Sequence, residues 1–108
     1  MRQTRLLSST FGFDQMTDSR ILIPGRRIAS RIVEGQALIL DPGTDALQRL
    51  NEVGSFIWAR ISERCHTRED IAQAIMAEFD VEAEQTNLDL AVFLQKLADD
   101  DFITYVAD

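Results

Sequence analysis

The hydrophobic pattern of the chain changes at Asn51, and this change constrains the fold more than any other feature. Before Asn51 the apolar residues fall into short β-prone runs at 28–33, 37–40 and 46–50. After Asn51 they recur every three or four residues, which is the period of an amphipathic helix. A chain with β structure first and helices afterwards is predicted to be an α+β protein.

Turn-forming residues separate the three predicted strands. The segment 34–36 is short enough for a tight hairpin, and the segment 41–45 is a longer loop in which Gly43 is free to take a positive φ. We expect three short strands in a meander. If the last of them, 46–50, lies at the edge of the sheet, its unpaired N–H and C=O groups can template an incoming extended peptide by strand addition.

Three helices are predicted in the remainder of the chain. Asn51 is suited to cap the first helix, Thr67 with Asp70 forms a variant of the capping box before the second, and the third covers residues 83–100. The predicted architecture is therefore winged-helix-like, with a three-stranded antiparallel sheet followed by a three-helix bundle.

Length and composition are those of one small globular unit. With 108 residues, of which 45% are apolar, the chain fits a single domain, placed at 20–108, with Phe102 and Ile103 closing its core. Residues 1–19 show no period, and we interpret them as an N-terminal extension for which mobility is one expectation. The apolar runs are too short for a signal peptide or a membrane span, so a cytoplasmic location and no membrane partner are expected.

Charge is distributed unevenly along the chain. Residues 1–35 carry six Arg against three acidic residues, a balance of plus three, so the remainder must sum to minus ten to give the total of minus seven. Because nucleic-acid binding draws most of its affinity from Lys and Arg that neutralise phosphates, this acidic body argues against a nucleic-acid partner. A cationic or neutral peptide suits the charge better.

Cysteine chemistry is limited to Cys65. A single cysteine forms no internal disulfide and no thiolate metal cage of the usual four-ligand type. His66 lies beside it, but neighbouring side chains rarely point at a common atom, and the sequence shows no third group to orient the histidine. We interpret the two residues as a loop pair ahead of the second helix, and predict no catalytic residue, no metal site and no cofactor.

The start of the first predicted helix carries a family signature. Residues 50–58 read LNEVGSFIW, which resembles the Leu-Asn-x-x-Gly-x-x-Ile-Trp pattern of PqqD-like proteins, the family of RiPP recognition elements. The resemblance covers roughly residues 28–104. Later features in the same order are also similar: a helix start at Thr67 and Ile71, an acidic-aromatic stop at 78–81, and the apolar residues Leu90, Phe93, Leu94 and Leu97 before Phe102.

Two residues depart from the family pattern. Gln48 stands where such strands often carry an apolar or aromatic residue, which puts the accepted peptide in question. Asp101 stands where a helix-ending Gly is common. Because Asp tolerates left-handed φ better than most residues, this departure costs little if Asp100 or Asp101 adopts that turn.

The resemblance implies a non-catalytic domain that captures the leader of a ribosomally made precursor peptide and presents it to a modifying enzyme, often a radical SAM protein, in natural product biosynthesis. It also implies that the leader lies as an added strand against residues 46–50 and over the third helix. On that helix, Leu88 and Val92 are four residues apart and are expected to form an exposed apolar strip. The candidate peptide-binding residues are Ala46, Leu47, Gln48, Arg49, Leu50, Asn87, Leu88, Ala91, Val92 and Gln95.

Two other functions remain open from the sequence. A winged-helix DNA-binding regulator would use the third helix for recognition, but residues 82–101 contain six acids against the single Lys96, so this helix would repel phosphates. A structural adaptor that binds a folded protein through Leu88 and Val92 would need no extended peptide. Titration with an isolated peptide separates the adaptor from the leader-binding domain.

Overall fold

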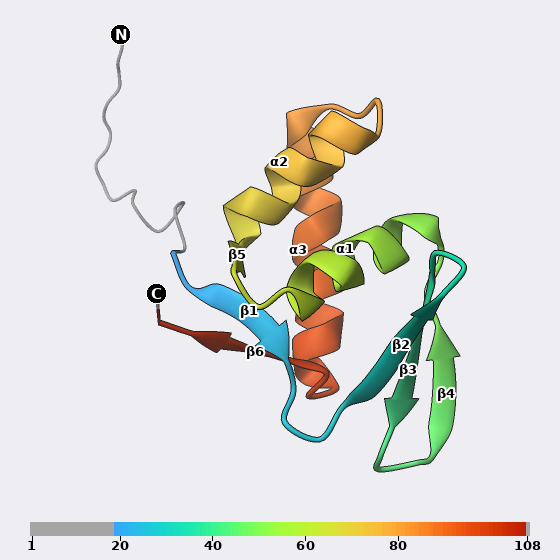
Figure 1. The fold of residues 1–108 in the computed structure, drawn as a ribbon. Coiled ribbons are helices and arrows are strands. Elements are labelled where there is room, and N and C mark those ends of the chain that lie inside the picture. Colours follow the sequence, from blue (N-terminus) through green and yellow to red (C-terminus); the bar gives the residue numbers. More distant parts are fainter. Residues whose placement is uncertain (1–18, 108) are drawn as a thin grey trace, which may run out of the picture.

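The structure is a computed structural model that describes residues 19–107, so the predicted N-terminal extension lies outside it apart from Ser19. Its described part contains three helices and two three-stranded antiparallel sheets, which together make an α+β fold (Figure 1). The elements in chain order are β1 (Ile21–Pro24), β2 (Ala29–Val33), β3 (Gln36–Asp41), β4 (Ala46–Arg49), α1 (Glu52–Ser62), β5 (His66–Thr67), α2 (Arg68–Glu78), α3 (Ala83–Asp99) and β6 (Ile103–Val106).

The predicted meander is the sheet with strand order β2-β3-β4, in which β4 lies at an edge. Glu34 and Gly35 have φ of 52° and 83°, and positive φ at both central residues matches the type I′ turn that suits a two-residue hairpin. The tight hairpin is therefore confirmed. In the longer loop the left-handed residue is Asp45 (φ 60°) rather than Gly43, because Asp41 accepts hydrogen bonds from both of their N–H groups and fixes the turn.

The β2-β3-β4 sheet has one face against the helices and one face away from them. Ala37 and Ile39 on β3 are fully buried, whereas the alternate residue Leu40 is exposed and Leu38 is only half-buried. Side chains of a strand alternate between its two faces, so the buried pair defines an inner face and Leu38 and Leu40 belong to an outer face.

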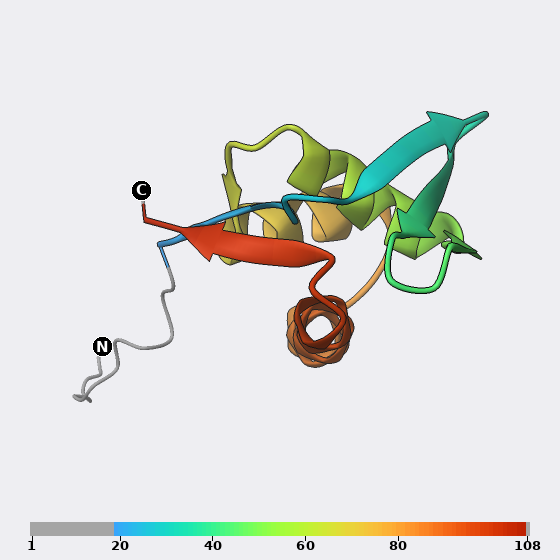
Figure 2. The same cartoon turned by 90° about the horizontal axis from the view of Figure 1, so that it is seen from below.

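A second sheet, with strand order β5-β1-β6, was not predicted from the sequence pattern. β1 pairs with β6 from Ile21↔Val106 to Pro24↔Ile103, which brings the two ends of the described chain side by side (Figure 2). The N–H of Gly25 donates to the C=O of Phe102, and a Cβ on this glycine would lie 2.4 Å from the C=O oxygen of Asp101. Only glycine allows so close an approach of the two backbones.

The helix starts follow the predicted caps. The Asn51 side chain accepts a 2.8 Å hydrogen bond from the N–H of Gly54, and Thr67 and Asp70 form both bonds of a capping box. At these two termini the caps satisfy N–H groups that have no partner inside the helix. The starts of α1 and α2 could therefore be predicted from the local sequence.

At the end of α3 an aspartate does adopt the left-handed turn. Asp101 has φ 62°, and its N–H donates to the C=O of Ala98 at 3.0 Å. The following N–H, of Phe102, donates to the C=O of Leu97 at 2.8 Å. These two bonds make a Schellman motif with Asp in the place usually taken by Gly.

The hydrophobic core lies between the inner sheet face, β1 and the three helices. Trp58 of α1 is fully buried at its centre, and its Nε1–H donates to the Oγ of Ser30 on β2 at 3.0 Å. Phe102 and Ile103 are buried, as expected. The largest fully buried side chains are Trp58, Phe102, Leu22, Ile39, Ile61, Ile71, Leu90 and Leu94.

Candidate functional site

An open groove of about 650 Å³ lies between β4 and α3, with residues of α1 and α2 also contributing to its lining. We call it the β4–α3 groove. Ile57, Ile75 and Leu90 are buried residues that contribute to it from three different helices. Val53 and Phe93 add partly exposed apolar surface. Polar side chains, among them Gln85 and Thr86, also line it, and a concave surface that combines apolar side chains with polar groups is typical of a ligand site.

The edge of β4 beside this groove has backbone groups without a strand partner. The N–H of Leu50 donates to the C=O of Ala37 on β3 at 3.0 Å. Backbone direction alternates along an antiparallel strand, so Gln48 also directs its N–H and C=O toward β3, while Leu47 and Arg49 direct theirs toward the free edge. β4 therefore offers the N–H and C=O of two residues to an added strand.

Gly54 gives the groove its close packing between α1 and α3. A Cβ at this position would lie 3.2 Å from the Cβ of Leu50 and 3.4 Å from Cζ of Phe93. Glycine in a helix costs about 1 kcal/mol relative to alanine. The contacts explain the presence of glycine here, because a side chain would push against the residue after β4 and against an α3 residue of the groove.

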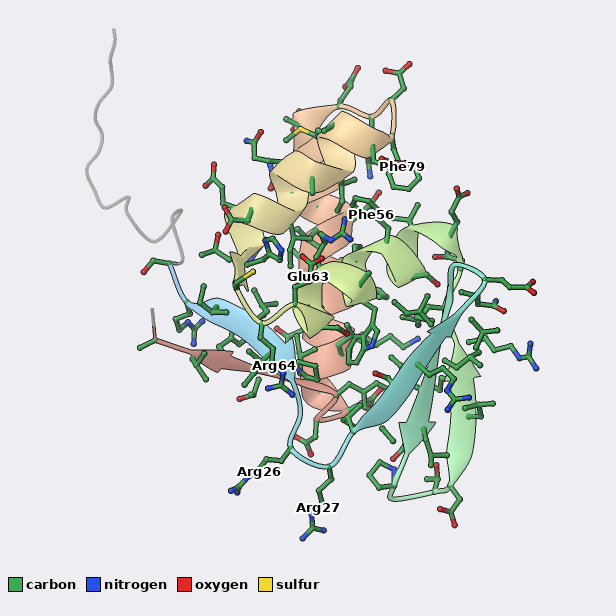
Figure 3. The ribbon with its side chains drawn as sticks, in the orientation of Figure 1. Arg26, Arg27, Phe56, Glu63, Arg64 and Phe79 are labelled. Atoms are coloured by element: carbon green, nitrogen blue, oxygen red, sulfur yellow. The ribbon has the colours of Figure 1, made fainter. Side chains whose placement is uncertain are left out.

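Two aromatic rings meet where α1 approaches the end of α2. Phe79, the C-cap residue of α2, packs edge-on against Phe56 of α1, with ring centroids 5.4 Å apart and an interplanar angle of 85° (Figure 3). The guanidinium of Arg60 lies 4.7 Å from the centroid of the Phe56 ring. Because Phe79 also lines the β4–α3 groove, this pair supports one part of its wall.

Comparison with known proteins identifies the family. Residues 36–103, more than half of the chain, match the family described as Coenzyme PQQ synthesis protein D (PqqD). The chain belongs to the PqqD family. The matched region begins at β3 and includes every residue that lines the β4–α3 groove. No curated protein matches the chain.

Two solved structures are similar to this PqqD-family chain. One is TbiB1 in complex with the TbiA(beta) leader peptide, with a TM-score of 0.71 and 29% identity over 80% of this chain and 99% of that chain. The other is lasso peptide synthetase B1 complexed with the leader peptide, with a TM-score of 0.67 and 20% identity over 77% of this chain and 96% of that chain. The second likeness shows the fold alone.

Only some of the peptide-binding residues predicted at 46–50 in this PqqD-family chain lie at the groove. Gln48, Arg49 and Leu50 line the groove, whereas Ala46 and Leu47 are exposed on the same strand beyond the lining. The strand at the sheet edge is the expected one.

The predicted α3 residues lie on other sides of the helix. Asn87, Leu88, Ala91, Val92 and Gln95 are not among the groove-lining residues of the described chain. Leu88 and Val92 are exposed, with 58% and 72% of their surface accessible, so the expected apolar strip exists. The side chain of Asn87 donates to the C=O of Ala83, and that of Gln95 donates to Oδ1 of Asp99. Their role in peptide binding stays a prediction.

Sequence reasoning missed the side of α3 that lines the groove most fully. Gln85, Asp89, Phe93 and Lys96 line it, and their spacing of four, four and three residues places them on one stripe of the helix. This stripe flanks the buried stripe that includes Leu90, on the side away from the predicted residues Asn87, Ala91 and Gln95. The half-buried Phe93 could have indicated this side of α3. A large aromatic residue at the edge of a buried stripe often contributes to the neighbouring surface as well as to the core.

The charged groups of the groove do not follow the acidic charge of the whole chain. Among the side chains of α3 that line the groove, Lys96 contributes one positive charge and Asp89 one negative charge. The body after residue 35 is strongly acidic, but the groove itself is close to neutral. The site therefore favours apolar anchors over a strongly charged ligand.

A cluster on the turn between α1 and α2 corrects one expectation. His66 does have a third group to orient it, because its Nε2 is in hydrogen-bond contact with Oε1 of Glu63. Exposed Cys65 is part of the same cluster, and the ligand atoms of the three residues lie within 4.8 Å of one another. Within residues 19–107 these three residues form the cluster that could hold a metal ion, but all come from one surface turn and lie outside the groove lining.

The pKa of Glu63 provides a test of this turn. The hydrogen bond from His66 is the main cause that lowers the pKa of the Glu63 carboxyl below 4.5, and Arg60, 3.6 Å away, acts in the same direction. A carboxyl whose pKa is depressed by folding contributes stability above its unfolded pKa, and this contribution is lost as the pH falls through the lower folded value.

Following the Glu63 carboxyl carbon by NMR should give a midpoint below 4.5, and His66→Ala should raise it toward the ordinary value. Arg60→Gln serves as the control and should raise it less. A midpoint that stays the same in His66→Ala would show that this contact is not made in solution.

None of the helices in residues 19–107 is both long and apolar enough to span a lipid bilayer.

Proposed function

We propose that this protein is a leader-peptide recognition element, which binds the leader region of a ribosomally synthesised precursor peptide and presents it to a modifying enzyme. The observation that carries the proposal is the free edge of β4 beside an apolar groove of about 650 Å³. Membership of the PqqD family supports it, as does the similar structure at 29% identity, which was solved with a leader peptide.

The proposed binding mode is strand addition to β4. The outward N–H and C=O groups of Leu47 and Arg49 pair with the backbone of the leader, and this pairing is independent of the peptide's sequence. Alternate side chains of an added strand point to the inner side, where they enter the groove between β4 and α3. Specificity therefore resides in the apolar groove, around Ile57 and Phe93.

In this proposal the domain itself performs no chemistry and needs no cofactor. The modifying enzyme, for which a radical SAM protein is our candidate, supplies the reaction. The domain raises the local concentration of the precursor at that enzyme by holding its leader. Because ordering a flexible peptide costs entropy, removing one large anchor side chain from the leader should weaken binding strongly.

A peptide titration tests the proposal. The probes are synthetic peptides covering the N-terminal halves of short open reading frames beside the gene, added to ¹⁵N-labelled protein. We expect the amide resonances of residues 46–50 and of the α3 stripe Gln85, Asp89, Phe93 and Lys96 to shift. A duplex DNA of random sequence serves as the control and should leave these resonances unchanged.

Two outcomes would contradict the proposal. Shifts confined to Leu88 and Val92 would assign peptide contact to the exposed strip of α3 and not to the groove. The absence of any shift with all of the candidate peptides, together with binding of a folded partner protein, would favour the adaptor.

A further inference from the structure

The outer face of the β2-β3-β4 sheet carries an exposed apolar row that crosses all three strands. The strand register pairs Ala29 with Leu40, and Leu40 with Leu47. All three residues are exposed, and Leu47 has 54% of its surface accessible. Val33 at the hairpin end adds a further exposed apolar side chain on the same face. Contiguous exposed apolar side chains on a soluble domain mark a protein contact surface.

A basic row lies directly beside the apolar row. Arg31 pairs with Leu38, and Leu38 pairs with Arg49, so two exposed arginines flank one half-buried leucine. Neither arginine forms an ion pair with an acidic residue within the described range 19–107. Arginine is also enriched at protein interfaces, where its planar guanidinium binds carboxylates with two parallel hydrogen bonds.

The charge of this face is opposite to the charge of the chain as a whole. The total is minus seven, yet the outward-facing strand positions hold Arg31 and Arg49 and no acidic residue. A surface with apolar and basic rows is complementary to an apolar surface that carries acidic side chains. It is poorly suited to a second copy's basic sheet face, because an isologous contact would bring arginines together.

A bound leader would enlarge the same face. β4 is the edge strand, so a peptide added to it becomes a fourth strand beside Leu47 and Arg49. Side chains of a strand alternate between the faces of its sheet, so those that do not enter the groove lie on the outer face, next to the apolar and basic rows.

We infer that the outer face of the β2-β3-β4 sheet is the docking surface for the modifying enzyme. The enzyme contacts this face through an apolar patch that bears carboxylates. At the same time it contacts the outward side chains of the bound leader. This inference rests on the proposed leader-binding function. The two faces of one sheet then have separate tasks: the inner side selects the peptide, and the outer side recruits the enzyme. Enzyme affinity is consequently higher for the leader-bound domain than for the free domain.

A charge reversal with a matched control tests the docking surface. The probe is the purified enzyme encoded beside the gene, with affinity measured by calorimetry in the presence and absence of the leader peptide. Arg31→Glu should weaken enzyme binding about tenfold or more, because it replaces an attraction by a repulsion. The control is Arg27→Glu, an identical charge change at the exposed β1–β2 turn, where Figure 3 shows Arg26 and Arg27 pointing away from the body. The control should change enzyme affinity less than threefold.

A second variant removes apolar surface from the same face without changing charge. Leu40→Ser, on the central strand β3, should also weaken enzyme binding severalfold. Thermal unfolding followed by circular dichroism verifies that each variant is folded. Both Arg31 and Leu40 lie away from the free edge of β4, so leader affinity should stay within twofold of the original protein in each variant.

The outcomes separate this inference from the proposed function. If the leader does not bind the original protein, the proposed function fails. If the leader binds but the enzyme binds all variants alike, or binds none, the docking surface is overturned while leader recognition stands. Light scattering tests for a dimer of this chain. A dimer that is disrupted by Arg31→Glu would assign the face to a second copy and would also overturn the inference.

Discussion

Arg49→Pro is expected to weaken leader binding by about tenfold or more. Arg49 directs its N–H toward the free edge of β4, so proline removes a donor that an added strand would use. One hydrogen bond contributes about 0.5–1.5 kcal/mol net, and the proline ring also occupies the path of the peptide. The N–H bonds that join β4 to β3 come from the alternate residues, so the sheet itself keeps its ladder.

Arg49→Ala is the matched control, because it removes the same side chain but keeps the backbone donor. Calorimetric titration with the leader peptide should show a much smaller loss for alanine than for proline. Thermal unfolding of both variants should remain close to that of the original protein. Equal losses for the two variants would mean that the guanidinium, and not the backbone edge, holds the peptide, and strand addition at this position would have to be abandoned.

Trp58→Ala is expected to lower the free energy of unfolding by about 3–5 kcal/mol. Trp58 is fully buried, and its indole N–H is bonded to Ser30, so the substitution removes both a large packed ring and the link between α1 and β2. A domain of ordinary stability has about 5–15 kcal/mol in total, so this loss removes a large fraction of the stability and would unfold a domain at the lower end of that range.

Urea unfolding of a small series resolves the two contributions of Trp58. Ser30→Ala removes only the hydrogen-bond acceptor and should cost about 1–3 kcal/mol, since it leaves the indole N–H without its partner. Trp58→Phe keeps most of the packing and should fall between Ser30→Ala and Trp58→Ala, and it remains measurable if the alanine variant does not fold. A loss below about 1 kcal/mol in Trp58→Ala would show that the hairpin is held to α1 by other contacts.

Local chemistry made much of the fold predictable. The change of period at Asn51 separates the meander from the helices, and the caps at Asn51 and Thr67 place two helix starts. The left-handed Asp101 agrees with the general tolerance of aspartate for that conformation. Each of these features depends on residues that are close together in sequence. All of the interacting residues can therefore be recognised within one short segment.

Features that join distant segments were not predictable in the same way. The pairing of Ile21 with Val106 spans almost the entire described chain, and neither four-residue strand shows a period long enough to identify it. The groove stripe of α3 was missed for a related reason. Helical period distinguishes a buried stripe from an exposed one, but only tertiary packing decides which flank of Leu90 borders β4.

The pairing of β1 with β6 also determines how this domain can be attached to other proteins. The chain enters at Ile21 and leaves near Val106, which are register partners in one sheet, and this sheet lies apart from the β4 edge (Figure 1). Adjacent entry and exit points are the geometry that allows a domain to be inserted into a loop of another protein. The same geometry permits insertion of this domain into a loop of another protein while the edge of β4 stays open.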